Sequence, residues 1–446
     1  MLRRALKTLL LGAVLAAVAV PGRAGADVQV SPPGNEANFV QSTYDFKLGR
    51  GAWSYFGDAR SVSRGPLVFT GWISTGGDVW VAQTDVRTRE THRRMIYANL
   101  GRDDHNNPSL VFWRGRLMAF FSEHSGPTLG KGAQMRYRTS KTRFDIRQGF
   151  GPVRKVPTNT AGGLGYTYPN PVRAGHRLFL FWRGGDWNPT FSATADGRRW
   201  SRARTLVTGP GTQTSPERPY AKYAEGPGDS FAATFSDAHV HDWKNSLYYL
   251  RYSQGAFHRA DGSRIGTLAD VPFTRAEVDV AYRYRDGAGR AWPHDVALGE
   301  GGRPVIVYTR RRGGPEGTDF FRYVRWDGER WIDRELISAG EGSPTFTSGG
   351  VTLDHENPAN VVLSRRVGEW NQVEFWNTPD GGAAWTRFTL TASPDAFSMR
   401  PVFPRGLQQT GRLVVVYTQG QSDGYRDFHT DVRMAIYEPS EYGDSG

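Results

Sequence analysis

Residues 372–391 read QVEFWNTPDGGAAWTRFTLT, two strand-like runs joined by a turn with the pattern Ser/Thr-x-Asp-x-Gly-x-x-Trp. The fixed positions of this turn are filled by Thr378, Asp380, Gly382 and Trp385. The aspartate can cap backbone N–H groups, the glycine can adopt a positive φ, and the tryptophan can pack between neighbouring sheets. Looser copies of the turn occur at Ala195–Trp200 and Trp326–Trp331. All three turns are predicted to be structural, with no catalytic role.

The rest of the sequence repeats the same kind of unit. A short strand, a turn with Gly or Asn and a stronger strand recur seven times, about 40 to 75 residues apart, each followed by two further strand-like runs. These strand pairs begin at Pro66, Asn107, Tyr168, Pro219, Pro293, Ser348 and Arg400. A repeat of this length with four strands is typical of a β-propeller. We predict an all-β fold, a seven-bladed β-propeller with four-stranded antiparallel blades, formed by a single domain over residues 27–446.

The N-terminal segment, residues 1–26, is predicted to be a signal peptide. Arg3, Arg4 and Lys7 precede a short apolar run, and Ala24-Gly25-Ala26 fits a small-residue cleavage site. The protein is therefore expected to be secreted and extracellular, and the paired arginines leave a twin-arginine route open. No later apolar run approaches the roughly 20 residues that span a bilayer, so no stable membrane anchor is expected.

The composition excludes several classes of site. With no cysteine there are no disulfides, thiolate metal sites or thiol nucleophiles, so this exported protein must be stabilised by packing. The formal net charge is +12, and loss of the four basic residues of the signal peptide leaves +8. This surplus indicates an acidic partner, but without a basic run that partner is not expected to be nucleic acid. We expect a monomer.

Basic and imidazole side chains recur at equivalent points of the repeats. In a propeller, the start of each innermost strand and the end of the second strand lie on one face. The residues at or just before strand starts are His105, Tyr168, Arg218, Lys222, His294 and Arg400, and those at strand ends are His124, Arg183, Asp237, His239, Arg310 and Arg365. This predicts a cationic central funnel that binds an anionic ligand.

Several of these residues also have a structural interpretation. His105, in the segment DDHNNP, could simply cap a turn. Arg310 and Arg365 could form salt bridges between blades, His294 could be a hydrogen-bonded strand-edge histidine, and His239 could lie in a solvated turn or a metal clip. Arg183 follows the apolar run LFLFW, where a charge costs free energy unless it has a partner or a ligand.

The residue types suit β-elimination from a uronic acid. Histidine and tyrosine can exchange protons, and arginine can neutralise a carboxylate through a bidentate contact. Glycoside hydrolysis ordinarily needs two positioned carboxylates instead, and the funnel points offer Glu123 and Asp237 but no clear pair. A sialidase would also need an N-terminal Arg-Ile-Pro motif, which the sequence lacks.

The chain resembles the BNR-repeat propeller family that contains the ulvan lyases and the L-rhamnose–glucuronate lyases. The motifs that carry the resemblance include DDHNNP from Asp103, FFSEH ending at His124, YTYPNPV from Tyr166, LFLFWRGG with Arg183, and MRPVFPRG from Met399. The resemblance implies that His105 and Tyr168 transfer protons, that His124 orients the substrate or the base, and that Arg183 holds the uronate carboxylate. Tyr166 is a rival for the tyrosine role. The residues expected in secondary binding roles are Arg218, Lys222, His239, His294 and Arg400.

We therefore expect a secreted polysaccharide lyase that acts on a rhamnose–uronate glycan, such as ulvan or arabinogalactan side chains. The reaction needs no metal or other cofactor, although a structural cation is an option. The cysteine-containing zinc site of some ulvan lyases is not carried over, because the chain has no cysteine. The alternatives are a glycoside hydrolase of the same family, an α-L-rhamnosidase, and a non-catalytic carbohydrate-binding propeller.

Overall fold

The computed structural model describes residues 29–30, 44–124, 134–157, 166–184, 186–209, 217–340, 349–391, 395–409 and 411–438. The predicted signal peptide lies outside these residues. Helix in the described ranges is limited to two short 3-10 turns, η2 (Asp104–Asn106) and η3 (Glu300–Gly302). No helix in this part of the chain is long and apolar enough to cross a membrane.

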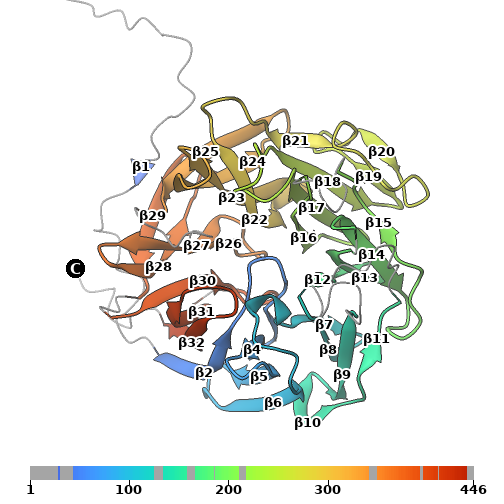
Figure 1. The fold of residues 1–446 in the computed structure, drawn as a ribbon, viewed down its shortest axis with the longest axis vertical. Helices are drawn as coiled ribbons and strands as arrows, with labels where there is room; N and C mark the ends of the chain where they lie inside the picture. The colour runs from blue at the N-terminus through green and yellow to red at the C-terminus, as the bar shows by residue number, and fades with distance from the viewer. Residues whose placement is uncertain are drawn as a thin grey trace, which may run out of the picture.

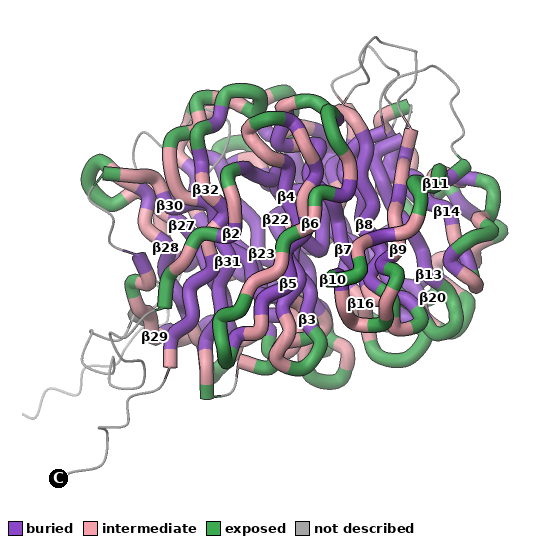
Figure 2. The backbone as a smooth tube through the Cα atoms, turned by 90° about the horizontal axis from the view of Figure 1, so that it is seen from below, coloured by how far each residue is buried: buried purple, intermediate pink, exposed green. Residues whose placement is uncertain are grey.

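The strands form antiparallel sheets that stand around a central axis (Figure 1). In the edge-on view, buried residues run through the strands and exposed residues concentrate in the loops (Figure 2). The fold is an all-β propeller with four-stranded antiparallel blades, as predicted.

Six sheets are formed by the described residues. Two of them have four strands each: β12 (Thr167–Ala174), β13 (Arg177–Arg183), β14 (Pro189–Thr194) and β15 (Arg204–Thr205), and β22 (Arg290–Leu298), β23 (Pro304–Arg312), β24 (Thr318–Trp326) and β25 (Trp331–Ser338). Another comprises β7 (Ser109–Trp113), β8 (Arg116–Phe121), β9 (Arg136–Arg143), β10 (Asp145–Phe150) and β11 (Arg154–Lys155). The next comprises β16 (Ala221–Glu225), β17 (Ser230–Ser236), β18 (Leu247–Ser253), β19 (Ala256–His258), β20 (Arg264–Thr267) and β21 (Asp279–Tyr282). The fifth comprises β26 (Val351–Leu353), β27 (Asn360–Val367), β28 (Trp370–Asn377), β29 (Ala384–Thr389) and β1 (Gln29–Val30).

The sixth sheet joins the two ends of the described chain. Its strands are β30 (Phe397–Val402), β31 (Leu413–Ser422), β32 (Phe428–Tyr437), β2 (Tyr44–Ala52), β3 (Ser61–Arg64), β4 (Leu67–Ser74), β5 (Val79–Asp85) and β6 (Thr91–Tyr97). β2 pairs antiparallel with β32 along most of its length, whereas only Gly51 and Ala52 pair with β4. β2 thus completes the unit formed by the last three strands and closes the ring, a pairing that the strand repeat did not predict.

The first predicted strand pair lies further from the central axis than the sequence repeat suggested. The pair predicted from Pro66 corresponds to β4 and β5, but β3 precedes it and pairs with the other edge of β4. The innermost strand of this unit is therefore β3, which packs against β7 of the next sheet.

The aspartate turns have the predicted geometry. Asp380 accepts hydrogen bonds from the backbone N–H groups of Ala383 and Ala384 at 2.9 and 2.8 Å. Trp385 is fully buried and meets Tyr323 of the preceding sheet edge-on, with ring centroids 5.2 Å apart. Packing of the motif tryptophan between neighbouring sheets is confirmed.

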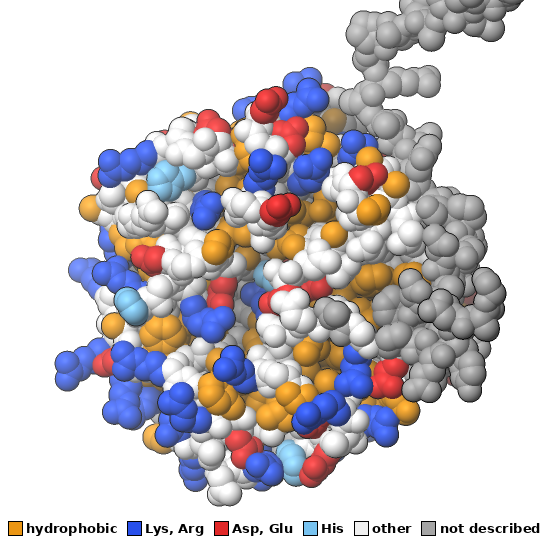
Figure 3. Space-filling view, turned by 180° about the vertical axis from the view of Figure 1, so that it is seen from behind, with side chains coloured by type: hydrophobic (Ala, Val, Ile, Leu, Met, Phe, Trp, Pro, Cys, Tyr) orange, Lys and Arg blue, Asp and Glu red, His pale blue; other side chains and the backbone are white. Residues whose placement is uncertain are grey.

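The innermost strands end on the face that is turned away in Figure 1. On that face a pocket of about 540 Å³ is lined by residues that include Arg173, Glu225, Glu356 and Arg405. Figure 3 shows basic and acidic side chains mixed around a shallow central hollow on this side.

Candidate functional site

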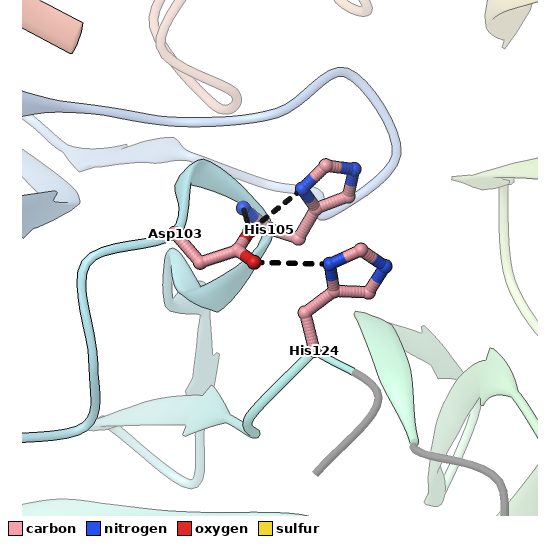
Figure 4. A group of neighbouring side chains, drawn as sticks. All are labelled: Asp103, His105 and His124. Carbon is pink, nitrogen blue, oxygen red and sulfur yellow. Dashed lines mark hydrogen bonds and ion pairs between the residues drawn. The ribbon is translucent and has the colours of Figure 1, made fainter. Parts of the chain in front are cut away.

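Two histidines that share one carboxylate form the centre of the site (Figure 4). Oδ1 of Asp103 lies 2.8 Å from Nδ1 of His105, and Oδ2 lies 3.1 Å from Nδ1 of His124. The two imidazole rings stack with centroids 4.0 Å apart and planes 13° from parallel. In Figure 4 the second ring nitrogen of each histidine points away from Asp103, so both Nε2 atoms are available for other contacts.

The antiparallel pairing of β7 with β8 brings these residues together. η2 precedes β7 and His124 follows β8, and Ser109 at the start of β7 pairs with Phe120 near the end of β8. Asp103 caps η2 by accepting a hydrogen bond from the backbone N–H of His105 at 3.0 Å. Asn106 accepts one from the backbone N–H of His124 at 2.7 Å. A separation of 19 positions in the sequence therefore becomes a direct ring contact.

The two histidines differ in charge at neutral pH. Burial lowers the pKa of His105, but the carboxylates of Asp104 and Asp103 outweigh it and raise that pKa to about 9. For His124, burial and the positive charge of His105 lower the pKa to about 4, although Asp103 opposes them. Burial disfavours the charged carboxylate of Asp103, yet both histidines together hold its pKa below the usual range. At neutral pH the stacked pair thus carries one positive charge, on His105.

Arg400 supports this cluster from the C-terminal part of the chain. Its guanidinium donates to Oδ2 of Asp104 at 2.5 Å and to the backbone carbonyl of Trp53. Oδ1 of Asp104 lies 2.8 Å from Nδ1 of His105. Arg400, predicted as a binding residue, is therefore engaged by the carboxylate that faces His105.

Arg183 is a buried cation at the end of β13. Its side chain is 5% exposed, and its Cζ lies 4.3, 4.8 and 5.3 Å from the ring centroids of Trp187, Tyr168 and Tyr220. One Nη donates to the Tyr220 hydroxyl at 2.9 Å. In the described ranges Nε has no hydrogen-bond partner, and no carboxylate pairs with the guanidinium. A buried charge in this state is costly, which favours an anionic ligand at this position.

Tyr168 lies between Arg183 and the histidines. Its ring centroid is 5.5 Å from that of His105. The pairing of β12 with β13 is interrupted between Thr167 and Asn170, and Tyr168 has a φ of 64° in this irregular stretch. Burial raises the pKa of Tyr168 well above 10, with Arg183 opposing, so the hydroxyl is protonated at neutral pH. The structure thus brings Tyr168 beside both His105 and Arg183.

Tyr166, the rival tyrosine, lies elsewhere. It is 1% exposed and belongs to a hydrophobic cluster with Phe120 and Trp182, between the sheets of β7 and β12. The structure therefore does not bring Tyr166 to the site.

The other predicted residues divide between the site and the interior. Arg218 lies over Trp187 at 5.1 Å and donates to Asp242 at 3.2 Å, and His239 packs 5.6 Å from the Tyr220 ring centroid. In contrast, Lys222 is fully buried and donates to the Asp58 carboxylate. His294 is 2% exposed, and burial lowers its pKa to about 3.

The strand-end arginines have carboxylate partners within their own sheets. Arg310 donates to Glu335 at 3.2 Å, and Arg365 donates to Glu374 at 2.8 Å. The salt-bridge interpretation holds for both, but the bridges do not run between blades.

The comparison with protein families gives a match over residues 67–339, to the family described as BNR repeat-containing family member. The chain belongs to the BNR repeat-containing family. The family expected from the sequence motifs is thereby confirmed.

Among solved structures, this BNR-repeat protein is similar to a polysaccharide lyase, the PL25 ulvan lyase. The form bound to -[GlcA(1-4)Rha3S]- is 15% identical in sequence, and the match covers 89% of this chain and 94% of that chain with a TM-score of 0.64. A second structure of the PL25 ulvan lyase matches with 16% identity, the same coverage and the same TM-score. The sialidase of Trypanosoma rangeli is 10% identical in sequence, and the match covers 89% of this chain and 60% of that chain with a TM-score of 0.44. Comparison with curated proteins gives no match.

Several residues of the BNR-repeat site were missed at the level of sequence. Tyr425, between β31 and β32, meets both imidazoles edge-on, at 5.2 and 5.5 Å between centroids. It has no sequence signal, since it lies in the last repeat, far from either histidine. Tyr220 directly precedes β16, so the strand-start rule could have found it together with Arg218.

Asp103, His105 and His124 are also the residues in the described ranges whose ligand atoms, all within 4.8 Å of one another, could hold a metal ion. In the structure both Nδ1 atoms lie at hydrogen-bond distance from Asp103, and the proton on His105 balances its carboxylate. Two neighbours also contact the trio, because Arg426 donates to Oδ2 of Asp103 at 3.2 Å and Asp104 lies 2.8 Å from Nδ1 of His105.

Proposed function

We propose that this BNR-repeat protein is a secreted polysaccharide lyase that cleaves next to a uronic acid by β-elimination, with no metal ion in the reaction. The substrate class we propose is a rhamnose–uronate glycan, bound as an anionic polymer by a monomeric propeller. Similarity in fold to an ulvan lyase and the predicted signal peptide are consistent with this proposal. We also propose that the ring has seven blades, because the eight-stranded sheet separates into two four-stranded units at the short pairing of β2 with β4.

One observation carries the proposal: Arg183 is a buried cation without a carboxylate partner in the described ranges. Three other predicted cations of the funnel have such partners, Arg218 with Asp242, Lys222 with Asp58, and Arg400 with Asp104. Arg183 is thus free to pair with the carboxylate of a uronate, beside two groups that can transfer protons.

The chemistry follows from charge neutralisation. With the uronate carboxylate paired to Arg183, and with the cationic His105 nearby, negative charge that develops on the carboxylate and C5 is stabilised. The C5–H bond breaks and its electron pair forms the C4–C5 double bond. The C4–O4 bond breaks, and O4 receives a proton from a general acid.

The charge states favour specific roles for the proton-transfer groups. His105 is protonated at neutral pH and cannot accept a proton, whereas the neutral His124 can accept one at Nε2 while Asp103 faces its Nδ1. Tyr168 keeps its hydroxyl proton and can donate it to O4, with Arg183 stabilising the phenolate that results. We therefore propose His124 as the base and Tyr168 as the acid, with His105 as an electrostatic partner rather than a base.

The direct test is to incubate the purified protein, residues 27–446, with ulvan and with gum arabic. Ultraviolet absorbance of an unsaturated uronate product supports the lyase, and the same rate after treatment with a chelator supports metal independence. New reducing ends or free rhamnose without that absorbance would identify a hydrolase. Retention of the glycan without either product would identify a binding module.

A further inference from the structure

An open groove of about 890 Å³ lies on the outer part of the sheet of β16 to β21. It is on the same face as the candidate site, because one loop serves both. The loop between β17 and β18 supplies His239 to the site and Trp243 and Lys244 to the lining of the groove. The groove is therefore placed to contact the same ligand as the site.

The lining of the groove combines aromatic rings with cations and with the carboxylates of Asp237 and Asp279. Trp243 is 36% exposed, an unusual exposure for so large an apolar side chain. Nζ of Lys244 lies 5.7 Å from the ring centroid of Tyr284. Arg283 is exposed and has no ion-pair partner within the described ranges. Aromatic rings pack against the apolar faces of sugars, and cations bind their carboxylate or sulfate groups.

The inner wall of the groove is held by buried ion pairs. Arg275 donates to Glu217 at 2.7 Å and also to the Asp237 carboxylate. Asp237 in turn accepts hydrogen bonds from the backbone N–H of Ser246 at 2.7 Å and from the Tyr248 hydroxyl at 2.9 Å. These contacts join the wall to the segment that carries Arg218, next to Glu217.

A continuous path leads from the site to the groove. Arg183 and Arg218 both lie over the Trp187 ring, and Arg218 pairs with Asp242, the residue before Trp243. These contacts lead from the sheet of β12 to β15, which carries Arg183, to the sheet of β16 to β21, which carries the groove.

We propose that the groove is a distal subsite that binds anionic sugar residues of the same polysaccharide, away from the cleaved bond, so that the protein prefers long chains. This rests on the proposed function. Trp243 and Tyr284 pack against sugar rings, and Arg283 binds the carboxylate or sulfate groups that those sugars carry, whereas Lys244 is paired with Asp286 at 3.0 Å.

The test compares kcat/KM for ulvan with kcat/KM for a tetrasaccharide derived from it. In Trp243→Ala and in Arg283→Ala we expect the polymer-to-tetrasaccharide ratio to fall about tenfold, the loss of a single good contact. The matched controls are Tyr44→Ala, an exposed aromatic on β2, and Arg330→Ala, an exposed arginine in the turn after β24. Both controls keep the wild-type ratio. An unchanged ratio in the two groove variants would overturn the proposal.

Two further experiments separate failure of the proposed function from failure of the subsite, and identify the group that is bound. If the wild-type protein gives no unsaturated product, the proposed function fails, and the groove is then tested by retardation in gels that contain ulvan. Weaker retardation of the groove variants would support the subsite, and equal retardation would overturn it. With desulfated ulvan, a tenfold effect of Arg283→Ala assigns the bound group as carboxylate, and loss of that effect assigns it as sulfate.

Discussion

His105 and His124 stack face to face, with centroids 4.0 Å apart, while both point Nδ1 at the carboxylate of Asp103. Two imidazolium ions at this separation would repel each other, so the pair holds a single positive charge in the neutral range. Asp104 and Asp103 together keep His105 cationic, while burial and this positive charge keep His124 neutral beside it. The pair can stabilise negative charge and accept a proton at the same pH.

The first prediction concerns the pH dependence of kcat/KM. A base is active when deprotonated, so with His124 as the base the activity should rise as the pH passes about 4. His105 acts as a cation, so the activity should fall as the pH passes about 9. A rate profile on a uronate glycan between these values should be flat. A rising limb near pH 9 instead would show that His105 is the base.

The second prediction concerns Arg183. Arg183→Gln should lower kcat/KM by about 10²- to 10³-fold, because the charge that develops on the uronate loses its buried counter-ion. Arg218→Gln is the matched control, since this arginine already has a carboxylate partner in Asp242. Its effect should be smaller and mainly on KM. Equal losses in the two variants would contradict a special role for Arg183.

The third prediction separates the two tyrosines. Tyr168→Phe should lower kcat by about 10²- to 10⁴-fold, the usual contribution of general acid catalysis, with the thermal unfolding temperature little changed. Tyr166→Phe should keep most of the activity, because Tyr166 lies in the hydrophobic cluster between sheets. The reverse result would move the acid to Tyr166.

The fourth prediction treats Lys222 as structural rather than as a binding residue. Burial lowers its pKa while the Asp58 charge opposes, and its Nζ donates to Asp58 and to the backbone carbonyl of Tyr55. Lys222→Met removes this partner but leaves Asp58 paired with Arg60 at 2.9 Å. It should lower the free energy of unfolding by about 1.5–3 kcal/mol, the contribution of a hydrogen bond to a charged group. Urea unfolding measures the loss.

Lys47→Met is the control for Lys222. It removes an exposed salt bridge to Asp431 and should cost less than about 1 kcal/mol. A raised KM in a stably folded Lys222→Met variant would restore Lys222 as a binding residue.

Much of the site could be predicted because propeller geometry turns sequence position into spatial position. Strand starts and ends meet on one face, so His105, His124, Tyr168 and Arg183 come together although they span 79 positions of the sequence. The same rule also selected Lys222 on β16 and His294 on β22, whose side chains are buried in the interior. The direction of a side chain depends on its neighbours in other sheets, and the position of a residue along its strand gives no information about those neighbours.

By itself, the sequence determined the features whose causes are local. The strand repeat and the aspartate turns follow from side-chain periodicity, glycine conformation and hydrogen bonds within a few residues, as at Asp380. Only the tertiary structure decided which charges have partners, because ion pairs such as Arg400 with Asp104 and Lys222 with Asp58 join segments that are distant in the sequence. The same holds for the pairing of β2 with β32. The unpaired charge of Arg183 and the different pKa values of the two histidines were also decided by the tertiary structure, since both depend on burial and on charges that packing brings close.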